Sequence, residues 1–575
     1  MRPSFDRTPG ALPRLIRAAA CACVLLVASV AVRAVAGNIT IIRDTWGIPH
    51  VFSNSDEGAM FGAGYATAED RLFQMHRNRR AVQGRLAELV GNMPGGSFGS
   101  TVQQDVYFRH HQLYKYSQRA AANLDVGTQR LLNAYCDGVN HYITTHAGQL
   151  HYLFAGQTPE PWTPADCVAV WNRMADYFGA GSSAFGKSRQ QHEFERLVAQ
   201  FGLEAAIEMF VGTPVVDESA AVVLPADLPQ TTVDAMYQYA IDHGFGNGTP
   251  LQGPPNTFSG AESAKFSHAW VVAGARSTTG AALLHSDPQT AVASPSLFYE
   301  LHVRGQTFDA RGIGTAGCPG FLIGFNRRIA WGLTALGADM ADLFELQSTG
   351  PNQYSYDGAP YMMDVSNEQI LVRNGTPVPI TVRDSIIGPV VTPLCQDVHT
   401  GEEFVLQTLP SHDAARHTVQ GTIAMMRGET LATFIDALDG WRHPGANIVF
   451  GDDLGNIAYW TLAAIPVRSA LAPVGPRIAQ DGSASQYQWQ ETLPLHVRPH
   501  VINPARGAIW SGNHLPIGSW YPIPLALGTG GGGDTTRSWR LAERLAGSAV
   551  LSPADMLTVH RDDVNPARRV VLRAG

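Results

Sequence analysis

The chain changes character at Ser267. Upstream, apolar residues recur at helical spacing over long stretches, whereas short runs downstream alternate apolar and polar residues as half-buried strands do. Between the two parts, residues 212–266 are rich in proline, glycine and small polar residues, which favours a loop or spacer with room for a short helix near 232–243. Loops of this length are uncommon inside compact domains and are often functional or removable. We therefore expect a helix-rich first part, a spacer, and a β-rich second part that starts at Ser267.

The expected helices and strands follow this division. In the first part, two strands are expected within residues 37–51, and helical spacing covers residues 56–90, 126–143, 164–178 and 189–210. In the second part, short strands are expected at 269–272, 282–285, 297–303, 321–323, 328–332, 342–346, 377–382, 403–406, 448–450 and 457–459. Three helices are expected there as well, at 431–438, 537–545 and 553–559.

Length and composition bound the class of protein. The 575 residues exceed one ordinary domain, and a content of 45% hydrophobic and 16% charged residues is that of a globular protein with a large core. The formal net charge is −8, so the chain lacks the basic footprint of a nucleic-acid-binding protein.

The first 36 residues have the pattern of a signal peptide. An arginine-rich start precedes an apolar run at 18–32, and small residues at 34–36 offer a cleavage site before Gly37. The apolar run is too short for a comfortable membrane span. We therefore expect a periplasmic or secreted protein that begins at Gly37 and has no stable membrane anchor.

Four cysteines remain after removal of this segment: Cys136, Cys167, Cys318 and Cys395. An oxidising compartment would allow disulfides, but the sequence leaves their pairing open. The sequence contains no Cys-x-x-Cys pair and no clustered histidine and cysteine spacing of the kind that predicts zinc. We therefore expect the 20 scattered histidines to be surface or core residues rather than metal ligands.

Several motifs, in this order along the chain, resemble those of penicillin acylases. The first part carries RDTWGIPH at 43–50 and GYATAEDRLFQM at 64–75. The second part carries SHAWVVAG at 267–274, SDPQ at 286–289, IAWGLTA at 329–335 and GAIWSGNH at 507–514. The resemblance runs from about residue 39 to the end and is weakest in the spacer. These penicillin acylases belong to the N-terminal nucleophile hydrolases and include acyl-homoserine lactone acylases.

The resemblance implies an α+β fold with a four-layer αββα sandwich and a helix-rich α-subunit. It also implies a zymogen that cuts itself to give an α-subunit at 37–212, a spacer peptide at 213–266 and a β-subunit at 267–575. The two subunits would form a heterodimer. The implied activity is hydrolysis of linear amides in small acylated amines, such as penicillins or N-acyl-homoserine lactones. Antibiotic resistance or quorum quenching would follow from such an activity, and no organic cofactor is implied.

Ser267 is the expected nucleophile. A serine hydroxyl is a weak nucleophile that needs a nearby base. Cleavage between Phe266 and Ser267 would free the α-amine of Ser267, whose reference pKa of ~7.7–8.0 suits a general base near neutral pH. Before cleavage this nitrogen is an amide and cannot accept a proton, so processing would activate the enzyme.

The resemblance assigns the remaining catalytic roles. The backbone N–H of Ala335 and the side-chain amide of Asn513 would donate to the oxyanion, where each such donor contributes ~2.7–4 kcal/mol. The backbone of Gln289 would contact the catalytic amine and the substrate. Arg537 would lie near that amine, where a fixed positive charge lowers the pKa of the amine.

Met174, Phe178, Ile323 and Thr290 match positions that line the acyl pocket of the family. Met174 and Phe178 lie one helical turn apart, so they would share a face, and ordinary core packing is the alternative for both. Ile323 and Thr290 replace aromatic residues of penicillin G acylase. We therefore expect an apolar acyl group other than phenylacetyl.

Asp339 and Asp342 match family positions that bind calcium, a hard cation that prefers oxygen ligands. Ala184, however, stands where the family's helix-rich subunit supplies a glutamate. With one carboxylate lost, the calcium site would be weaker, rebuilt or absent.

Three further departures from the family affect the expected processing and length. Phe266 precedes the cleavage site, where the family often has a small residue, and His268 follows the nucleophile in place of a common asparagine. Relatives commonly continue well past the motif at 552–556, whereas this chain stops at Gly575. The chain is therefore expected to be a fragment or a shortened member.

Two other functions stay open. Residues 95–99 fit the G-x-S-x-G motif of α/β-hydrolases, but that motif needs a strand before it and a helix after it, and residues 100–102 do not predict a helix. The chain could instead be an exported binding protein that keeps the acylase fold without catalysis. The retained serine, glutamine, asparagine and arginine argue against this second alternative.

Overall fold

The computed structural model describes residues 38–150, 158–180, 182–211, 221–245, 266–290, 292–412, 417–469, 471, 475–523, 525, 536–547 and 549–564. The expected signal peptide lies outside the described residues, as does much of the expected spacer. Within the described ranges, no helix combines the length and the apolar character that a membrane span requires.

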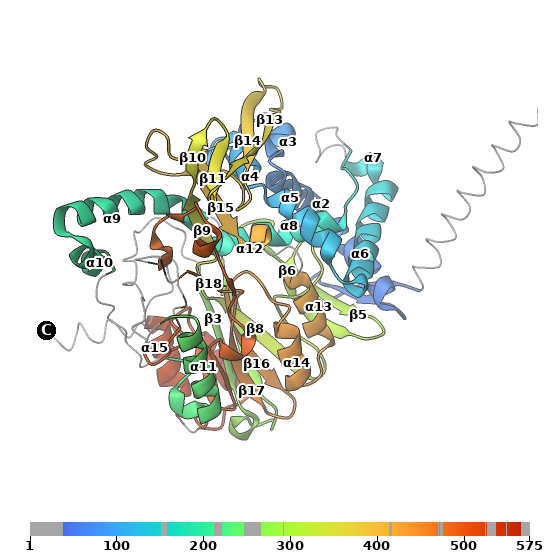
Figure 1. Cartoon of the computed structure of the whole chain (residues 1–575). Coiled ribbons are helices and arrows are strands. Elements are labelled where there is room, and N and C mark those ends of the chain that lie inside the picture. Colours follow the sequence, from blue (N-terminus) through green and yellow to red (C-terminus); the bar gives the residue numbers. More distant parts are fainter. Residues whose placement is uncertain are drawn as a thin grey trace, which may run out of the picture.

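A nine-stranded sheet forms the centre of the molecule (Figure 1). In spatial order its strands are β1 (Thr40–Arg43), β2 (Pro49–Phe52), β5 (Phe298–Arg304), β6 (Asp309–Thr315), β7 (Ile323–Phe325), β8 (Ile329–Ala335), β16 (Ala446–Asp452), β17 (Ile457–Leu462) and β21 (His500–Ile502). The β2–β5 pair is parallel and all other neighbours are antiparallel. The sheet therefore joins strands from both sides of the expected cleavage point.

Strands β16 and β17 show why this sheet is covered on both faces. Along β16, Ile448 and Phe450 belong to one core cluster, whereas Val449 between them belongs to another. In β17, Trp460 joins the first cluster and Tyr459 the second. Because side chains alternate between the faces of a strand, each cluster marks one buried face of the sheet.

Helices cover the first face. The helices of the first part are α2 (Asp56–Val82), α3 (Leu86–Val90), α4 (Thr101–His111), α5 (Leu113–Asn123), α6 (Val126–Thr145), α7 (Ala147–Leu150), α8 (Pro164–Ala175), α9 (Lys187–Phe201) and α10 (Leu203–Val211). Of these, α2, α5, α6 and α8 contribute side chains to the cluster on this face. Helices α2 and α6 pack closely at Gly64 and Gly138, where an added Cβ would lie 2.0 Å and 1.9 Å from backbone oxygens of the other helix. From the second part, α13 (Thr418–Arg427) and α14 (Leu431–Leu438) contribute to the same core cluster.

A three-stranded sheet covers the second face. It consists of β22 (Ala508–Ser511), β3 (Phe266–Val272) and β4 (Leu283–Gln289). At Gly332 in β8 the two sheets approach so closely that an added Cβ would lie 2.6 Å from Cβ of Ser286. The opposite face of the small sheet packs against α15 (Thr536–Leu545) and α16 (Pro553–His560), with Trp270 and Trp510 meeting Leu541 and Met556.

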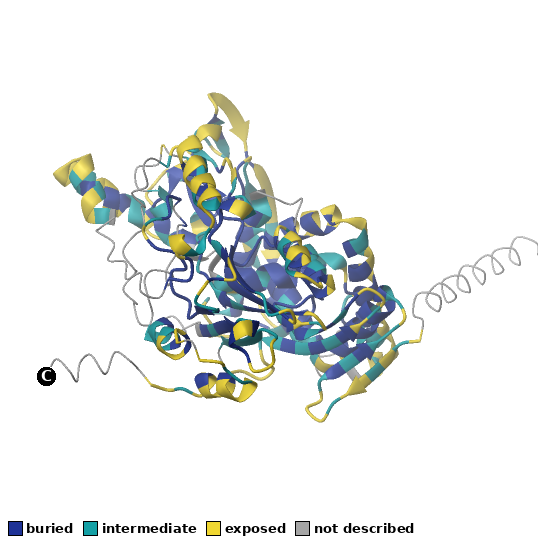
Figure 2. Ribbon diagram, turned by 90° about the horizontal axis from the view of Figure 1, so that it is seen from below, coloured by how far each residue is buried: buried dark blue, intermediate teal, exposed yellow. Residues whose placement is uncertain are grey.

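The remaining strands form smaller sheets beside this core. They are β15 (Phe404–Thr408), β9 (Ala341–Glu345) and β19 (Gln480–Asp481) in one sheet, β10 (Gln347–Gly350), β11 (Gln353–Tyr356) and β12 (Ala359–Met362) in a second, and the pairs β13 (Asp364–Ile370) with β14 (Val378–Asp384) and β18 (Pro466–Val467) with β20 (Glu491–Thr492). Figure 2 shows buried residues concentrated in the central strands and exposed residues on the outer helices and the β13–β14 hairpin.

Most expected elements are confirmed, and the differences have identifiable causes. Helices α4 and α5 were not expected, and the expectation that residues 100–102 are not helical is wrong, because α4 begins at Thr101 with Ser100 as its N-cap. The buried face of α4 carries polar residues such as Asp105, which accepts hydrogen bonds from the Leu86 and Ala87 N–H groups, so the apolar periodicity is hidden. The G-x-S-x-G segment still follows no strand.

The described middle of the expected spacer is folded onto the second part. The short helix expected near 232–243 is confirmed as α11 (Gln230–Asp242), in which Met236 and Ala240 are buried. The N–H groups of Val222 and Val223 both donate to the Pro516 carbonyl at 2.9 Å. This segment therefore contributes to the core beside the small sheet.

Candidate active site

Ser267 lies at the start of β3 and is buried. Its backbone N–H donates to Asn513 Oδ1 at 2.8 Å. Asn513 follows β22, which pairs with β3 so that Ser511 lies opposite Ala269. The chain that leaves β22 is therefore brought to the beginning of β3.

Asn513 adopts a left-handed backbone conformation, with φ of 65°. Asparagine tolerates this region better than most residues other than glycine. Its Oδ1 accepts hydrogen bonds from both Ser267 and Arg537, so its Nδ2 faces the other way and donates to the Ala335 carbonyl at 2.8 Å. The amide group is thereby fixed in one orientation.

Strand β8 turns the peptide groups of Ala335 toward the same asparagine. Ala335 pairs with Ala446 of β16, and the next N–H, that of Leu336, donates to the Gly445 carbonyl at 3.1 Å. Hydrogen-bonded and non-hydrogen-bonded pairs alternate in an antiparallel ladder, so the N–H and C=O of Ala335 both point away from β16. Since the carbonyl meets Asn513, the N–H lies on that side too.

Arg537 connects these groups from the first turn of α15. Its Nη1 donates to the Ser267 carbonyl at 2.6 Å and its Nη2 donates to Asn513 Oδ1 at 3.0 Å. Burial lowers the pKa of Arg537 to about 10, which still leaves the guanidinium charged at neutral pH. A fixed positive charge therefore lies beside the Ser267 backbone.

Gln289 and His268 lie on the neighbouring strand positions. Gln289 pairs with Phe266 in the β3–β4 ladder, and its side chain contacts His268 Nδ1 at 3.1 Å and donates to Asp287 at 2.8 Å. Burial and the nearby charge of Arg537 lower the pKa of His268 to about 4. His268 is therefore neutral near pH 7 and directly follows Ser267 in the chain.

A buried polar network behind Ala335 was not expected from the sequence. Asn447 Nδ2 donates to Thr334 Oγ1 at 3.1 Å and to the Ala335 carbonyl at 3.4 Å, and Tyr459 donates to Asn447 Oδ1 at 2.5 Å. The Thr334 hydroxyl also meets Ser511 Oγ at 2.7 Å. The sequence feature that could have indicated this network is Asn447, a polar residue within the apolar run 446–450.

The matches to known proteins extend over nearly the whole chain. A family model described as penicillin amidase matches residues 38–574. The chain belongs to the penicillin amidase family.

Similar proteins within this family are only distantly related in sequence. The chain is 26% identical over 551 residues to a penicillin acylase 2 proenzyme of Pseudomonas sp. strain SE83, covering 94% of the chain and 66% of that protein. It is also 26% identical to the acyl-homoserine lactone acylase QuiP of Pseudomonas fluorescens (92% and 62%) and to penicillin G acylase of Escherichia coli (88% and 63%). The chain thus spans slightly less than two thirds of the length of these curated relatives.

A solved structure of thermostable penicillin G acylase from Alcaligenes faecalis also matches. Its TM-score is 0.44 at 22% identity, with 51% of each chain covered. A TM-score this low does not by itself establish a common fold.

Three of the four pocket positions inferred from the penicillin amidase family lie in or against the main hydrophobic core. Met174 in α8 is buried, and it shares one apolar cluster with the partly buried Phe178 and Ile323 and with Leu333 of β8. Phe178 lies in a π-helical turn (Asp176–Ala180), a feature often found at functional sites. Thr290 directly follows the end of β4, where Gln289 pairs with Phe266. Their contact with a substrate stays a prediction.

The two aspartates expected to bind calcium are instead engaged by side-chain cations. Lys187 Nζ lies 2.9 Å from Asp339 Oδ2, 2.8 Å from Asp342 Oδ1 and 2.6 Å from the Ala341 carbonyl. Arg468 Nε donates to Asp342 Oδ2 at 2.6 Å. Burial by itself would raise the pKa of Asp342, but the charges of Arg468 and Lys187 hold it well below its usual range.

These residues do not fit a calcium ion in this arrangement. Ala184, at the position of the family glutamate, is fully buried in an apolar cluster and offers no oxygen. The Lys187 ammonium occupies the space between the carboxylates and already neutralises charge there. We therefore assign calcium no step in the chemistry of this chain.

All four expected cysteines have free thiols in the structure. The Sγ atoms of Cys136 and Cys167 lie 3.8 Å apart, well beyond the ~2.05 Å of a disulfide bond. Burial raises the pKa of the Cys395 thiol to about 12, so this cysteine is a poor nucleophile near neutral pH.

Proposed function

We propose that the protein is an exported amidohydrolase that cleaves the amide bond of small acylated amines with Ser267 as nucleophile. One observation carries the proposal: Ser267, Ala335, Asn513 and Arg537 come from four separate segments and are joined in one hydrogen-bond network through the Asn513 amide. The names of the relatives, which are penicillin and acyl-homoserine lactone acylases, support the amide substrate class. A binding protein without catalysis would not need this arrangement.

Activation would require cleavage between Phe266 and Ser267. The Ser267 N–H and C=O are already held by Asn513 and Arg537, so the same contacts would position the amine once it is free. The products would be an α-subunit at 37–212 and a β-subunit at 267–575, joined as a heterodimer after loss of the spacer peptide. The designation of one relative as a proenzyme supports such processing.

The catalytic cycle follows from this geometry. The free amine of Ser267, acting through a water, takes the hydroxyl proton as Oγ attacks the acyl carbon. The resulting oxyanion would accept hydrogen bonds from Asn513 Nδ2 and the Ala335 N–H. The protonated amine then gives its proton to the leaving nitrogen as the C–N bond breaks, and water hydrolyses the serine ester to release the acid.

Arg537 and His268 would tune the base. The Arg537 charge disfavours protonation of the neighbouring amine and so lowers its pKa. His268 is neutral near pH 7 and adds no second charge there. The amine would therefore be available as a base at neutral pH.

The packing order of helices, large sheet, small sheet and helices supports a four-layer αββα architecture with Ser267 at the start of an inner strand. Phe178 and Ile323 are partly buried against the same core as Met174, and their apolar character supports an apolar acyl group. Export by the segment at 1–36 would put the reaction in the periplasm or outside the cell.

The test uses the full chain and its Ser267→Ala variant, with Ser366→Ala, an exposed serine in β13, as the matched control. Wild type and Ser366→Ala should each give two polypeptides, the larger beginning at Ser267. They should also release acid from at least one of the phenylacetyl, glutaryl and fatty acyl amides, with an acyl adduct in intact mass spectra. Ser267→Ala should stay a single chain and form no adduct. A wild-type protein that is active while uncut would overturn the proposal.

A further inference from the structure

Helix α9 lies against the segment that precedes β15 (Figure 1). Ser188 Oγ donates to the Gln396 carbonyl at 2.5 Å, and the Gln396 N–H donates to the Phe185 carbonyl at 3.2 Å. One turn further along α9, His192 faces the residues that follow Gln396. Two parts of the chain on opposite sides of the expected cleavage point therefore meet here.

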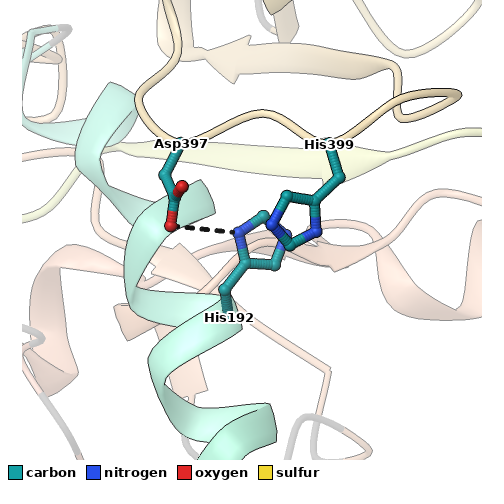
Figure 3. A group of neighbouring side chains, drawn as sticks. All are labelled: His192, Asp397 and His399. Carbon is teal, nitrogen blue, oxygen red and sulfur yellow. Dashed lines mark ion pairs between the residues drawn. The ribbon is translucent and has the colours of Figure 1, made fainter.

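His192, Asp397 and His399 gather their polar atoms at this contact (Figure 3). One ligand atom from each lies within 4.8 Å of the other two. His192 Nδ1 lies 3.5 Å from Asp397 Oδ2, and the two imidazole rings are stacked with centroids 3.8 Å apart. Two atoms bound tetrahedrally to zinc at ~2.0–2.1 Å lie about 3.3–3.4 Å apart, close to the separation of His192 Nδ1 and Asp397 Oδ2. The exposed His399 ring would have to turn out of the stack to direct a nitrogen at the same ion.

Glu402 fixes the orientation of the His192 ring. Its Oε1 lies 2.8 Å from His192 Nε2. A carboxylate only accepts, so Nε2 carries the proton and the Nδ1 of a neutral ring is left with a lone pair that faces the Asp397 carboxylate. Nδ1 is buried and makes no hydrogen bond in the described structure. Two facing acceptors need a cation between them, either a proton or a metal ion.

The carboxylates around the cluster would attract a cation. Four carboxylates surround His192, from Asp397, Glu402, Glu195 and Glu345. Among the described residues, no arginine or lysine forms an ion pair with any of the four. A divalent cation would balance the negative charge of these carboxylates.

We propose that His192 Nδ1, Asp397 and a ring nitrogen of His399 bind a divalent transition-metal ion such as Zn²⁺. Imidazole and carboxylate ligands suit zinc, and three protein ligands leave a fourth position for water. Glu402 acts as the outer carboxylate that orients a metal-binding histidine. His192 and Glu402 are 210 positions apart along the chain, so a local spacing motif could not have predicted the site.

The metal would connect α9 to the segment before β15. His192 is 4% exposed, whereas the side chain of His399 is 62% exposed, so the ion can enter from solvent on the His399 side. The site is independent of the aspartates that Lys187 binds and of the proposed acylase chemistry.

The test measures zinc binding by calorimetry on the untagged full chain after removal of metals. The variants are His399→Ala and Asp397→Asn, which change exposed residues, and His192→Gln; the control is His496→Ala, which removes an exposed histidine elsewhere. Wild type and control should bind one Zn²⁺ per chain, and their thermal midpoints should rise with Zn²⁺. Each ligand variant should bind at least about tenfold more weakly. Circular dichroism confirms that each variant is folded.

Cobalt provides a second readout. Co²⁺ should give the intense visible absorption of a four-coordinate site in wild type and in His496→Ala, and this absorption should be lost in His399→Ala. The proposal is overturned if wild type binds no zinc, or if His399→Ala and wild type bind it with equal stoichiometry and affinity. Zinc binding and cobalt absorption do not depend on acylase activity. Both results can therefore be interpreted even if the protein hydrolyses none of the amides.

Discussion

The Oδ1 of Asn513 accepts a 2.8 Å hydrogen bond from the Ser267 nitrogen, while the Nδ2 of the same amide donates over 2.8 Å to the Ala335 carbonyl. One side chain thus joins the start of β3 to the end of β8. Both of its polar atoms are used, and Arg537 adds a second donor to the oxygen. The amide can turn only if all of these contacts change together.

Replacing Asn513 should therefore impair catalysis strongly. With Asn513→Ala, we expect kcat to fall about 10²–10³-fold, as for loss of one oxyanion donor. Steady-state kinetics on the best substrate measures this. Asn374→Ala is the matched control, because Asn374 also has a left-handed backbone but is exposed and distant in sequence from the site. Equal activity of Asn513→Ala and wild type would contradict the assigned role.

Removing the charge of Arg537 should change the pH profile. A cation beside an amine lowers the pKa of the amine, so Arg537→Gln should raise it. The base is active when neutral, and hence the acid limb of kcat/KM should move to higher pH. The control is Arg540→Gln. Arg540 lies in the same helix as Arg537 but pairs with Asp562, so its loss should leave the acid limb in place. If processed Arg537→Gln and wild type have their acid limbs at the same pH, the charge of Arg537 does not tune the pKa of the amine.

Lys187 should be essential for stability, because without it two buried carboxylates lose a counter-charge. Lys187→Ala should lower the free energy of unfolding by about 3–5 kcal/mol, whereas Lys115→Ala on the surface should cost about 1 kcal/mol or less. Denaturant titration measures both. Calcium should leave the melting temperature of wild type unchanged and raise that of Lys187→Ala. A calcium-dependent rise in wild type would show that the aspartates bind the ion after all.

Acid should destabilise the protein before its carboxylates are protonated. His417 and His443 both contact Asn172 Oδ1, at 3.0 Å and 2.6 Å. Burial, with the charge of Arg442, lowers the pKa of His443 to about 3, and burial lowers that of His417 as well. The ordinary pKa of ~6.5 applies in the unfolded chain, which therefore binds protons first as the pH falls.

Stability should thus be complete above about pH 6.5 and decline steadily from there toward pH 4.5. Urea unfolding at pH 7.5, 6.5, 5.5 and 4.5 measures the slope. His443→Gln should show a shallower slope, since one of the buried titrating rings is gone. A slope unchanged in this variant would mean that other groups cause the acid sensitivity.

Sequence patterns predicted the helices and strands that are determined by residues close together along the chain. The helix expected at 431–438 is confirmed as α14, because a clear apolar stripe packs on the large sheet. Helix α4 was missed because its buried face carries Asp105, whose partners are the N–H groups of another segment. Buried polar residues of this kind can be interpreted only once their partners are known.

The candidate site shows the same division. Motifs identified Ser267, Asn513 and Arg537 individually, but their hydrogen bonds depend on the pairing of β22 with β3. Lys187 could not be predicted as a partner of Asp339 and Asp342, which lie 152 and 155 positions away. Only the folded arrangement shows that a side chain supplies the cation.

Lys187, whose ammonium group contacts the carboxylates of both Asp339 and Asp342, would have a second role after the chain is cut. Lys187 and the aspartates would then belong to separate polypeptides, and pulling them apart would break two ion pairs of a largely buried lysine. Partner exchange between molecules would be correspondingly slow. Each heterodimer would keep, throughout its working life, the same two pieces that were folded together as one precursor.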